Sequence, residues 1–221
     1  MITALVIAGA SCSGKTTVVN ALLEKYPNLE LSRSVTTRAP RGDGNDGEYI
    51  YLDREGFERE VSKGNILEYT EYSGELYGTP HSELCRISKS GKTPVLILDL
   101  NGVASVVSSD RVKACAIYIW DDIDVIDKRL YERYLGTPSL DGFKKYVSRK
   151  ERNNQDFLSV GEFSSNFYAF LKNSDSPEMT GEKVMKILSD FESGVKRNED
   201  RIALASDEMI SSLNRMYSKK I

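Results

Sequence analysis

An apolar run, a glycine-rich loop and a helical pattern follow one another at the start of the chain, and this order constrains the fold most. The run Ala4–Gly9 is continuous and apolar, as expected of a strand buried on both faces of a parallel sheet. The next segment, Gly9-Ala-Ser-Cys-Ser-Gly14-Lys15-Thr16, matches the pattern G-x-x-x-x-G-K-[ST]. Residues 16–26 then have apolar side chains at a helical period, which Pro27 ends. This order predicts a phosphate-binding loop.

The chemistry of such a loop assigns roles to its residues. Its glycines allow consecutive backbone N–H groups to point at phosphate oxygens, and the N-terminus of the helix adds its dipole. Lys15 would reach the β- and γ-phosphates, and the hydroxyl of Thr16 would bind Mg²⁺. The motif predicts that a nucleoside triphosphate binds along Gly9, Ala10, Ser11, Cys12, Ser13, Gly14, Lys15, Thr16 and Thr17.

The rest of the chain alternates between apolar runs and helical patterns. Three further runs predict strands at residues 94–100, 114–120 and 167–171. Helices are predicted at residues 53–63, at 79–90 with Thr79 as N-cap and Pro80 in the first position, and at 123–134. Strands that alternate with helices predict the α/β class, with a parallel sheet flanked by helices.

Three regions depart from this alternation. Residues 32–80 are rich in Ser, Thr, Arg, Gly and Tyr and predict a small β-rich insert. Residues 134–157 are polar and predict a mobile segment with helical parts. The tail from Glu199 predicts an amphipathic helix, which could pack on the core or on a second subunit. Its apolar stripe consists of Ile202, Ala205, Met209, Leu213 and Met216.

Composition limits the partners that the protein can have. The 221 residues include 30 Lys and Arg against 33 Asp and Glu, a net charge of −3, so no field of the whole protein attracts nucleic acid or an anionic membrane. Any phosphate site must be local. Three separated cysteines fit neither a disulfide framework nor a zinc site and favour the cytoplasm. The single histidine, His81, excludes a histidine-rich metal site.

A second set of residues suggests a second phosphate. Arg38 and Arg41 lie three residues apart on a segment that Pro40 stiffens, and two guanidinium groups can clamp a phosphate. Tyrosine hydroxyls can donate to phosphate as well. A buried carboxylate such as Glu68 can accept two N–H bonds from the edge of guanine, which adenine does not offer. Each of these features is weak alone.

Taken in order, these segments resemble guanylate kinase, the family that phosphorylates GMP with ATP. The resemblance rests on the phosphate-binding loop and on four later segments, and it covers about residues 3–190. These segments are S-x-T-T-R-x-P-R from Ser34, the G-E-Y turn ending at Tyr49, the run from Leu67 to Thr79, and the stretch from Ser90 to Val103.

The resemblance implies a role for each matching residue. The GMP phosphate would be held by Arg38, Arg41, Tyr49 and Tyr77, and guanine would be recognised by Ser34, Glu68 and Thr79. The arginines of a lid would be Arg149, within about residues 134–157, and Arg129 and Arg133, just before that segment. Asn173 would lie near the adenine of ATP. The catalytic groups would be Lys15, Arg38, Arg129 and Arg149. The family's strand usually reads D-I-D, but here Ile97 replaces the first aspartate, which leaves Asp99 as the acidic candidate.

The resemblance also implies an organisation and an activity. Residues 1–31 and 81–190 would form the kinase core, 32–80 the domain that binds the nucleoside monophosphate, and 191–221 a C-terminal extension. ATP with Mg²⁺ and GMP or dGMP would be the partners, with no nucleic acid or membrane, and the protein would be a monomer or homodimer. Because of Ile97, a different acceptor stays open as an alternative. A second alternative is a non-catalytic module that binds phosphopeptides, although such modules typically have a damaged phosphate-binding loop.

Overall fold

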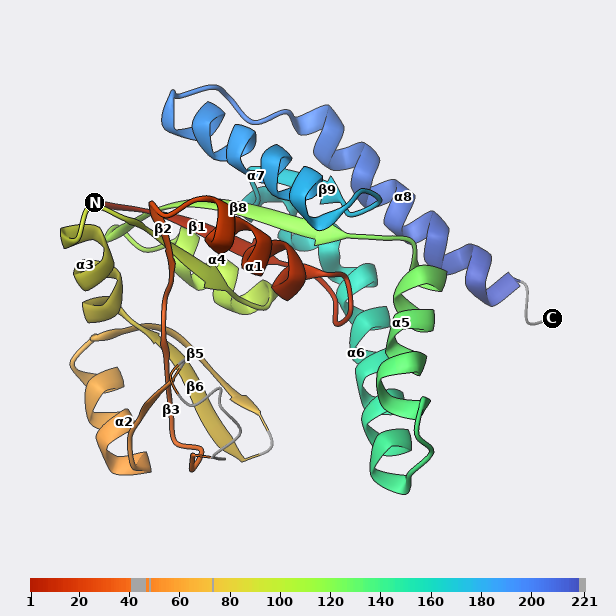
Figure 1. Ribbon diagram of the computed structural model, residues 1–221, viewed down its shortest axis with the longest axis horizontal. Coiled ribbons are helices and arrows are strands. Elements are labelled where there is room, and N and C mark those ends of the chain that lie inside the picture. Colours follow the sequence, from red (N-terminus) through yellow and green to blue (C-terminus); the bar gives the residue numbers. More distant parts are fainter. Residues whose placement is uncertain (41–46, 48, 73, 219–221) are drawn as a thin grey trace. The chain divides into compact units, whose positions relative to one another are not determined.

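The computed structural model describes residues 1–40, 47, 49–72 and 74–218, and Figure 1 shows its helices and strands. In chain order these are β1 (Ile2–Ala8), α1 (Lys15–Lys25), β2 (Leu29–Leu31), β3 (Ser34–Thr36), β4 (Tyr49–Tyr51), α2 (Arg54–Ser62), β5 (Ile66–Tyr72), β6 (Glu75–Pro80), α3 (His81–Lys89), β7 (Thr93–Ile97), α4 (Leu100–Val107), β8 (Val112–Trp120), α5 (Ile123–Leu135), α6 (Leu140–Phe163), the 3₁₀ helix η2 (Ser164–Asn166), β9 (Ala169–Lys172), α7 (Pro177–Glu192) and α8 (Glu199–Ser218).

The strands form a sheet of five and a sheet of four. The larger sheet has the order β2-β7-β1-β8-β9, and the pairs β2–β7 and β8–β9 are parallel. The central strand β1 is fully buried from Ala4 to Ala8, as its continuous apolar sequence predicted. The predicted α/β class with a parallel sheet is confirmed. The phosphate-binding loop follows the carboxyl end of β1, where ligands bind in sheets of this kind.

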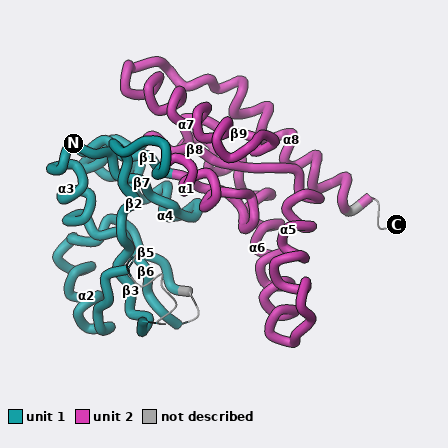
Figure 2. Tube along the Cα trace, viewed as in Figure 1, with its two compact units in different colours: residues 1–6, 23–114 teal, residues 7–22, 115–221 magenta. Residues whose placement is uncertain are grey.

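Two compact units make up the chain, and Figure 2 colours them separately. The first unit contains Met1–Val6 and Leu23–Ala114, and the second contains Ile7–Leu22 and Cys115–Ile221. Strand β1 therefore begins in one unit and ends in the other. None of the described helices is both long enough and apolar enough to cross a bilayer.

The four-stranded sheet lies in the first unit and has the order β4-β3-β6-β5. Strand β3 pairs in parallel with β4 and antiparallel with β6. Val35, Leu76 and Phe57 of α2 form its small core. Helix α2 begins at Asp53, whose carboxylate accepts a hydrogen bond from Gly56 N at 2.7 Å.

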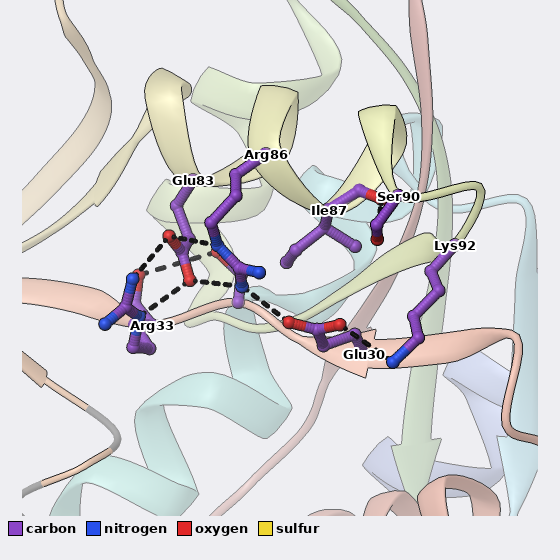
Figure 3. A network of polar contacts seen from close by, with 8 residues as sticks. Glu30, Arg33, Glu83, Arg86, Ile87, Ser90 and Lys92 are labelled. Carbon is purple, nitrogen blue, oxygen red and sulfur yellow. Dashed lines mark hydrogen bonds and ion pairs between the residues drawn. The ribbon is translucent and has the colours of Figure 1, made fainter.

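An ion-pair network joins two segments of this unit (Figure 3). The chain passes from one sheet to the other in both segments, between β2 and β3 and again through α3 between β6 and β7. Glu83 of α3 is 3% exposed and accepts hydrogen bonds from Arg33, at 2.8 and 3.0 Å, and from Arg86, at 2.9 and 3.0 Å. Arg33 lies between β2 and β3, and α3 directly follows β6. Burial alone would raise the pKa of Glu83, but these hydrogen bonds lower it to about 2.

Helix α3 starts later than its sequence predicted. Thr79 and Pro80 look like an N-cap and a first helical residue, but they are the last residues of β6, and α3 begins at His81. Pro80 takes the N-cap position and makes no side-chain capping bond. The reason is tertiary: the hydroxyl of Thr79 donates to Glu68 and does not accept a bond from the first turn of the helix. The prediction of the N-cap is therefore wrong.

The second unit contains a helical hairpin, α5 and α6, and the C-terminal helix α8. Most of the polar segment 134–157 is α6, a continuous helix of 24 residues whose first turn is capped by Ser139. Helix α8 packs against α5, α6 and β9 of its own unit. The predicted apolar stripe of α8 is buried, with exposed fractions of 0 to 9% for Ile202, Ala205, Met209, Leu213 and Met216.

Candidate active site

The phosphate-binding loop has an unusual backbone. Gly9, Cys12 and Gly14 all have positive φ angles, of 148°, 64° and 97°. A Cβ on Gly9 would lie 2.1 Å from the carbonyl oxygen of Ile119, and one on Gly14 would lie 2.2 Å from Nδ2 of Asn173. Only glycine fits these two positions, which explains both glycines of the motif.

Lys15, the first residue of α1, turns back onto this loop. Its Nζ donates to the carbonyl oxygens of Gly9 and Ala10 at 2.7 and 2.6 Å. Burial is the main cause that lowers the pKa of Lys15 to about 8, while Asp156 acts in the opposite direction. The ammonium group is therefore charged at pH 7 and holds hydrogen bonds that phosphate oxygens could replace.

A cavity of about 540 Å³ lies beside the loop, within the second unit. Its ionisable lining consists of Lys15, Arg129, Arg133, Arg149, Tyr134, Cys12 and Asp175. Four cations against one carboxylate make it a local positive site in a protein of net charge −3. The remaining lining residues are Ser11, Gly14, Thr16, Thr17, Val18, Asn173 and Pro177, so most of the predicted triphosphate residues meet here. Gly9, Ala10 and Ser13 do not line it; Ala10 and Ser13 are fully buried.

Two arginines of the helical hairpin reach the loop. Nη1 of Arg129 lies 3.5 Å from the carbonyl oxygen of Cys12, and Arg129 also pairs with Asp121 at 3.0 Å. Nη1 of Arg149, on α6, lies 3.5 Å from Oγ of Ser11. Both side chains thus lie next to the loop.

The donors available to Mg²⁺ in this site are few. Thr16 is in the first turn of α1, is exposed and lines the cavity. Among the described residues, no group of three or more His, Cys, Asp or Glu side chains could hold a metal ion. One hydroxyl beside a phosphate site fits Mg²⁺, which keeps several waters and is bound largely through the phosphates of a nucleotide.

A cationic and aromatic cluster lies in the first unit. The guanidinium carbon of Arg38 is 5.0 Å from the ring centroid of Tyr49, and the ring of Tyr77 lies 6.2 Å from that of Tyr49. Nη1 of Arg38 is buried and has no hydrogen-bond partner in the described part of the chain. Ser34 is opposite Tyr49 in the pairing of β3 with β4. The predicted partner Arg41 lies outside the described residues.

A half-buried carboxylate lies in the same unit. Oε1 of Glu68 accepts a hydrogen bond from Oγ1 of Thr79 at 2.6 Å. Burial raises the pKa of Glu68 to about 7; nearby Asp99 adds to the rise and the Thr79 bond opposes it. Asp99 accepts a bond from Gly102 N at 2.9 Å and so caps α4. A Cβ on Gly102 would lie 3.1 Å from Oε2 of Glu68, so the carboxylate is close to the start of α4.

Comparison with known proteins shows the family of this chain. A family model described as guanylate kinase matches residues 1–148. The guanylate kinase of Rubrobacter xylanophilus is 43% identical over 116 residues, 52% of this chain and 60% of that protein. The guanylate kinase of Lactobacillus delbrueckii subsp. bulgaricus is 32% identical over 202 residues, 88% of this chain and 97% of that protein. The chain belongs to the guanylate kinase family.

A solved structure agrees with this membership. The guanylate kinase from Anaplasma phagocytophilum aligns with a TM-score of 0.56 and 27% identity, covering 90% of this chain and 89% of that one. The chain is an ATP-dependent nucleoside monophosphate kinase, a transferase of nucleotide metabolism. The matched family region ends at residue 148, so Arg149, the rest of α6 and all of α8 lie beyond it.

Two polar side chains hold the loop, and one of them, Asn153, was not predicted from the sequence. Asn153 of α6 is buried, accepts a bond from Ser11 N at 2.8 Å and donates to Ser11 O at 3.0 Å. Asn173 was predicted near adenine; its Nδ2 donates to Ser13 O at 2.8 Å, and its Oδ1 accepts from Thr180. No local motif marks Asn153, which is 142 residues from its partner.

Proposed function

We propose that this kinase transfers the γ-phosphate of ATP to GMP or dGMP, giving ADP and the diphosphate. The observation that carries the proposal is the half-buried carboxylate of Glu68 beside the hydroxyl of Thr79, 2.6 Å away. A carboxylate can accept bonds from both N1–H and the exocyclic amine of guanine. Adenine has no N–H at the corresponding ring position, so it would leave the carboxylate unpaired.

The acceptor's phosphate is proposed to bind at the cluster of Arg38, Tyr49 and Tyr77. Nη1 of Arg38 is a buried donor that has no hydrogen-bond partner among the described residues, and a phosphate oxygen would satisfy it. Arg41 would add a second guanidinium group. Ser34 and Thr79 would complete the guanine site with Glu68, and Asp99 would supply a further acceptor near it.

ATP is proposed to bind in the cavity of the second unit. Backbone N–H groups of the loop would hold the phosphates, and Lys15 would exchange its carbonyl partners for phosphate oxygens. Thr16 would hold Mg²⁺, which neutralises phosphate charge when bound. Asn173, whose Nδ2 donates to Ser13 O of the loop, would lie near the adenine of ATP.

Phosphoryl transfer of this kind proceeds by positioning and electrostatics, without a covalent enzyme intermediate. An oxygen of the acceptor's phosphate attacks the γ-phosphorus in line, the bond to the β-phosphate oxygen breaks, and ADP leaves. Lys15, Arg129 and Arg149 would stabilise the charge on the transferring group, an effect typically worth about 3 kcal/mol per lost donor.

One observation keeps a different acceptor as a second candidate. Ile97 ends β7 where the family usually has an aspartate, so the guanine side of the site has one acidic group fewer. Asp99 is used as the cap of α4. A nucleoside monophosphate other than GMP is therefore the alternative to be tested.

The cellular location, the domain division and the oligomeric state of the protein are also proposals. The three cysteines are unpaired, as expected in a reducing compartment such as the cytoplasm. We propose the division into a core of residues 1–31 and 81–190 with a lid at about 134–157, an acceptor domain at 32–80, and an extension at 191–221. The protein would act as a monomer or homodimer.

An assay of ADP release across a panel of nucleoside monophosphates tests the acceptor. Turnover with GMP and dGMP is expected at rates far above those with AMP, CMP and UMP. Faster turnover with another monophosphate would establish the second candidate. If the protein binds ATP but turns over none of these monophosphates, the result would favour a non-catalytic binding module.

A further inference from the structure

Helix α5, which carries Arg129 and Arg133, does not cap its own N-terminus. Its N-cap residue Asp122 makes no side-chain capping bond. The first amide of the helix, Ile123 N, instead donates to Oγ of Ser212 at 2.8 Å, in a buried contact. Ser212 is on α8, 89 residues further along the chain. Helix α8 thus provides a cap that is normally local.

Further contacts join α8 to the same helical hairpin. Arg215 of α8 lies 3.7 Å from Asp122, which also pairs with Lys172 of β9 at 2.9 Å. Met216 of α8 lines a small pocket together with Ile123 of α5 and Asn153 of α6. The buried stripe of α8 therefore packs at the base of the two helices whose arginines line the triphosphate cavity.

The contacts continue from α6 to the phosphate-binding loop. Asn153 bonds both N and O of Ser11, so a displacement of α6 would displace the loop. Arg129 and Arg149 each lie 3.5 Å from atoms of that loop. A shift of about 1 Å in such groups is enough to affect catalysis strongly.

We propose that α8 is a functional part of the ATP site and that Ser212 is a positioning residue for it. By capping α5, Ser212 fixes the N-terminus of the helix that carries Arg129 and Arg133. This inference rests on the proposal that ATP binds in the cavity of the second unit. It gives the C-terminal helix, beyond the matched family region, a role in nucleotide binding.

The test compares Ser212→Ala with Ser211→Ala, an exposed serine next to it on the same helix. Hydrogen exchange of the Ile123 amide is measured first, in the full chain without nucleotide. Loss of a cap should accelerate this exchange by roughly two- to thirtyfold in Ser212→Ala and leave it unchanged in Ser211→Ala. Ser212→Thr, which keeps the hydroxyl, should restore slow exchange.

Kinetics then separate positioning from general destabilisation. Ser212→Ala should raise the KM for ATP several-fold and leave the KM for the monophosphate unchanged, because its residues lie in the other unit. The inference is overturned if exchange at Ile123 does not change, or if the KM for ATP stays at the wild-type value. If wild-type protein transfers no phosphate, exchange and direct titration with ATP still test the inference, so its failure is distinct from that of the proposed function.

Discussion

Two ionisable side chains, one in each unit, have pKa values that burial moves toward neutrality. The pKa of Lys15 is about 8 and that of Glu68 about 7. Lys15 is charged below about pH 8, so affinity for ATP should fall as the pH rises above that value. Glu68 is ionised only above about pH 7, so guanine binding should strengthen as the pH rises toward and past that value.

The pH dependence of GMP use tests Glu68 directly. Below pH 7, kcat/KM for GMP should rise by up to about tenfold per pH unit and then level off. The matched control is Glu68→Gln, which retains the other titrations, including that of the GMP phosphate, with a pKa of about 6, and that of Lys15. The ratio of the two profiles isolates Glu68. A ratio that does not vary between pH 5 and 8 would show that its ionisation plays no part.

The raised pKa of Glu68 also affects stability, which should fall as the pH rises, whereas guanine binding should strengthen. Because the pKa of Glu68 in the folded protein lies above its usual value of 4.5, its contribution to stability is present below pH 4.5 and is lost as the pH rises through about 7. Glu68→Gln should therefore have a higher Tm than wild type at pH 8, and the difference should shrink at pH 5. Thermal unfolding at the two pH values checks this, and an equal difference at both would contradict it.

Lys15 is the residue whose loss should be most damaging to turnover. Lys15→Ala removes the cation nearest the loop and should lower kcat roughly a thousandfold or more. Lys186→Ala is the control, because Lys186 is 76% exposed on α7 and pairs only with Asp190 in the contacts described. Steady-state rates with saturating ATP and GMP measure the effect. Full turnover by Lys15→Ala would rule out the assignment of the loop.

At the scale of elements, local sequence patterns predicted what local interactions decide. The phosphate-binding loop, the central strand and the stripe of α8 follow from motif and periodicity, and all were found. The start of α3 did not follow, because Thr79 serves Glu68 across β5 and β6 rather than the helix after it. The roles of Asn153 and Ser212 could not be predicted either, because their hydrogen-bond partners are 142 and 89 residues away in the chain.

The network around Glu83 gives a prediction for α3. Glu83→Gln should destabilise the protein by roughly 2 kcal/mol, since a buried partner is lost while water screens Arg33 and Arg86, which are 43% and 46% exposed. The pKa of Glu83 is lowered, so its contribution is present above pH 4.5 and lost as the pH falls toward about 2. Chemical denaturation at pH 7 and pH 3 measures both.

The control for that network is Glu58→Gln, on exposed α2. Glu58 is 61% exposed and lies 3.9 Å from Arg54, so its loss should change stability by less than about 0.5 kcal/mol. Equal losses in the two variants would show that burial of Glu83 is unimportant.

Helix α6 gives a second prediction at this scale, through Asn153. Asn153→Ala leaves Ser11 N and O without their partners and should raise the KM for ATP several-fold. The control is Gln155→Ala, an exposed amide on the same helix. The role assigned to Asn153 would be lost if both variants had the KM of wild type.

At the scale of the whole molecule, charge is divided unevenly. The chain carries a net charge of −3, yet the cavity beside the loop is lined by Lys15, three arginines and one aspartate. A local phosphate site within a mildly acidic protein was predicted from composition and motif together. Composition and motif did not point to Arg129 and Arg149, which only the family resemblance suggested, because these arginines meet the loop only in the folded unit.

A guanine-selective acceptor site and a triphosphate site are proposed to serve one reaction. The decisive measurement is kcat/KM for GMP, IMP and AMP with wild type and Glu68→Gln. IMP keeps N1–H but lacks the exocyclic amine, so we expect kcat/KM to decrease in the order GMP, IMP, AMP in wild type and to differ much less in Glu68→Gln. Equal use of GMP and AMP by wild type, or an unchanged spread in the variant, would contradict it.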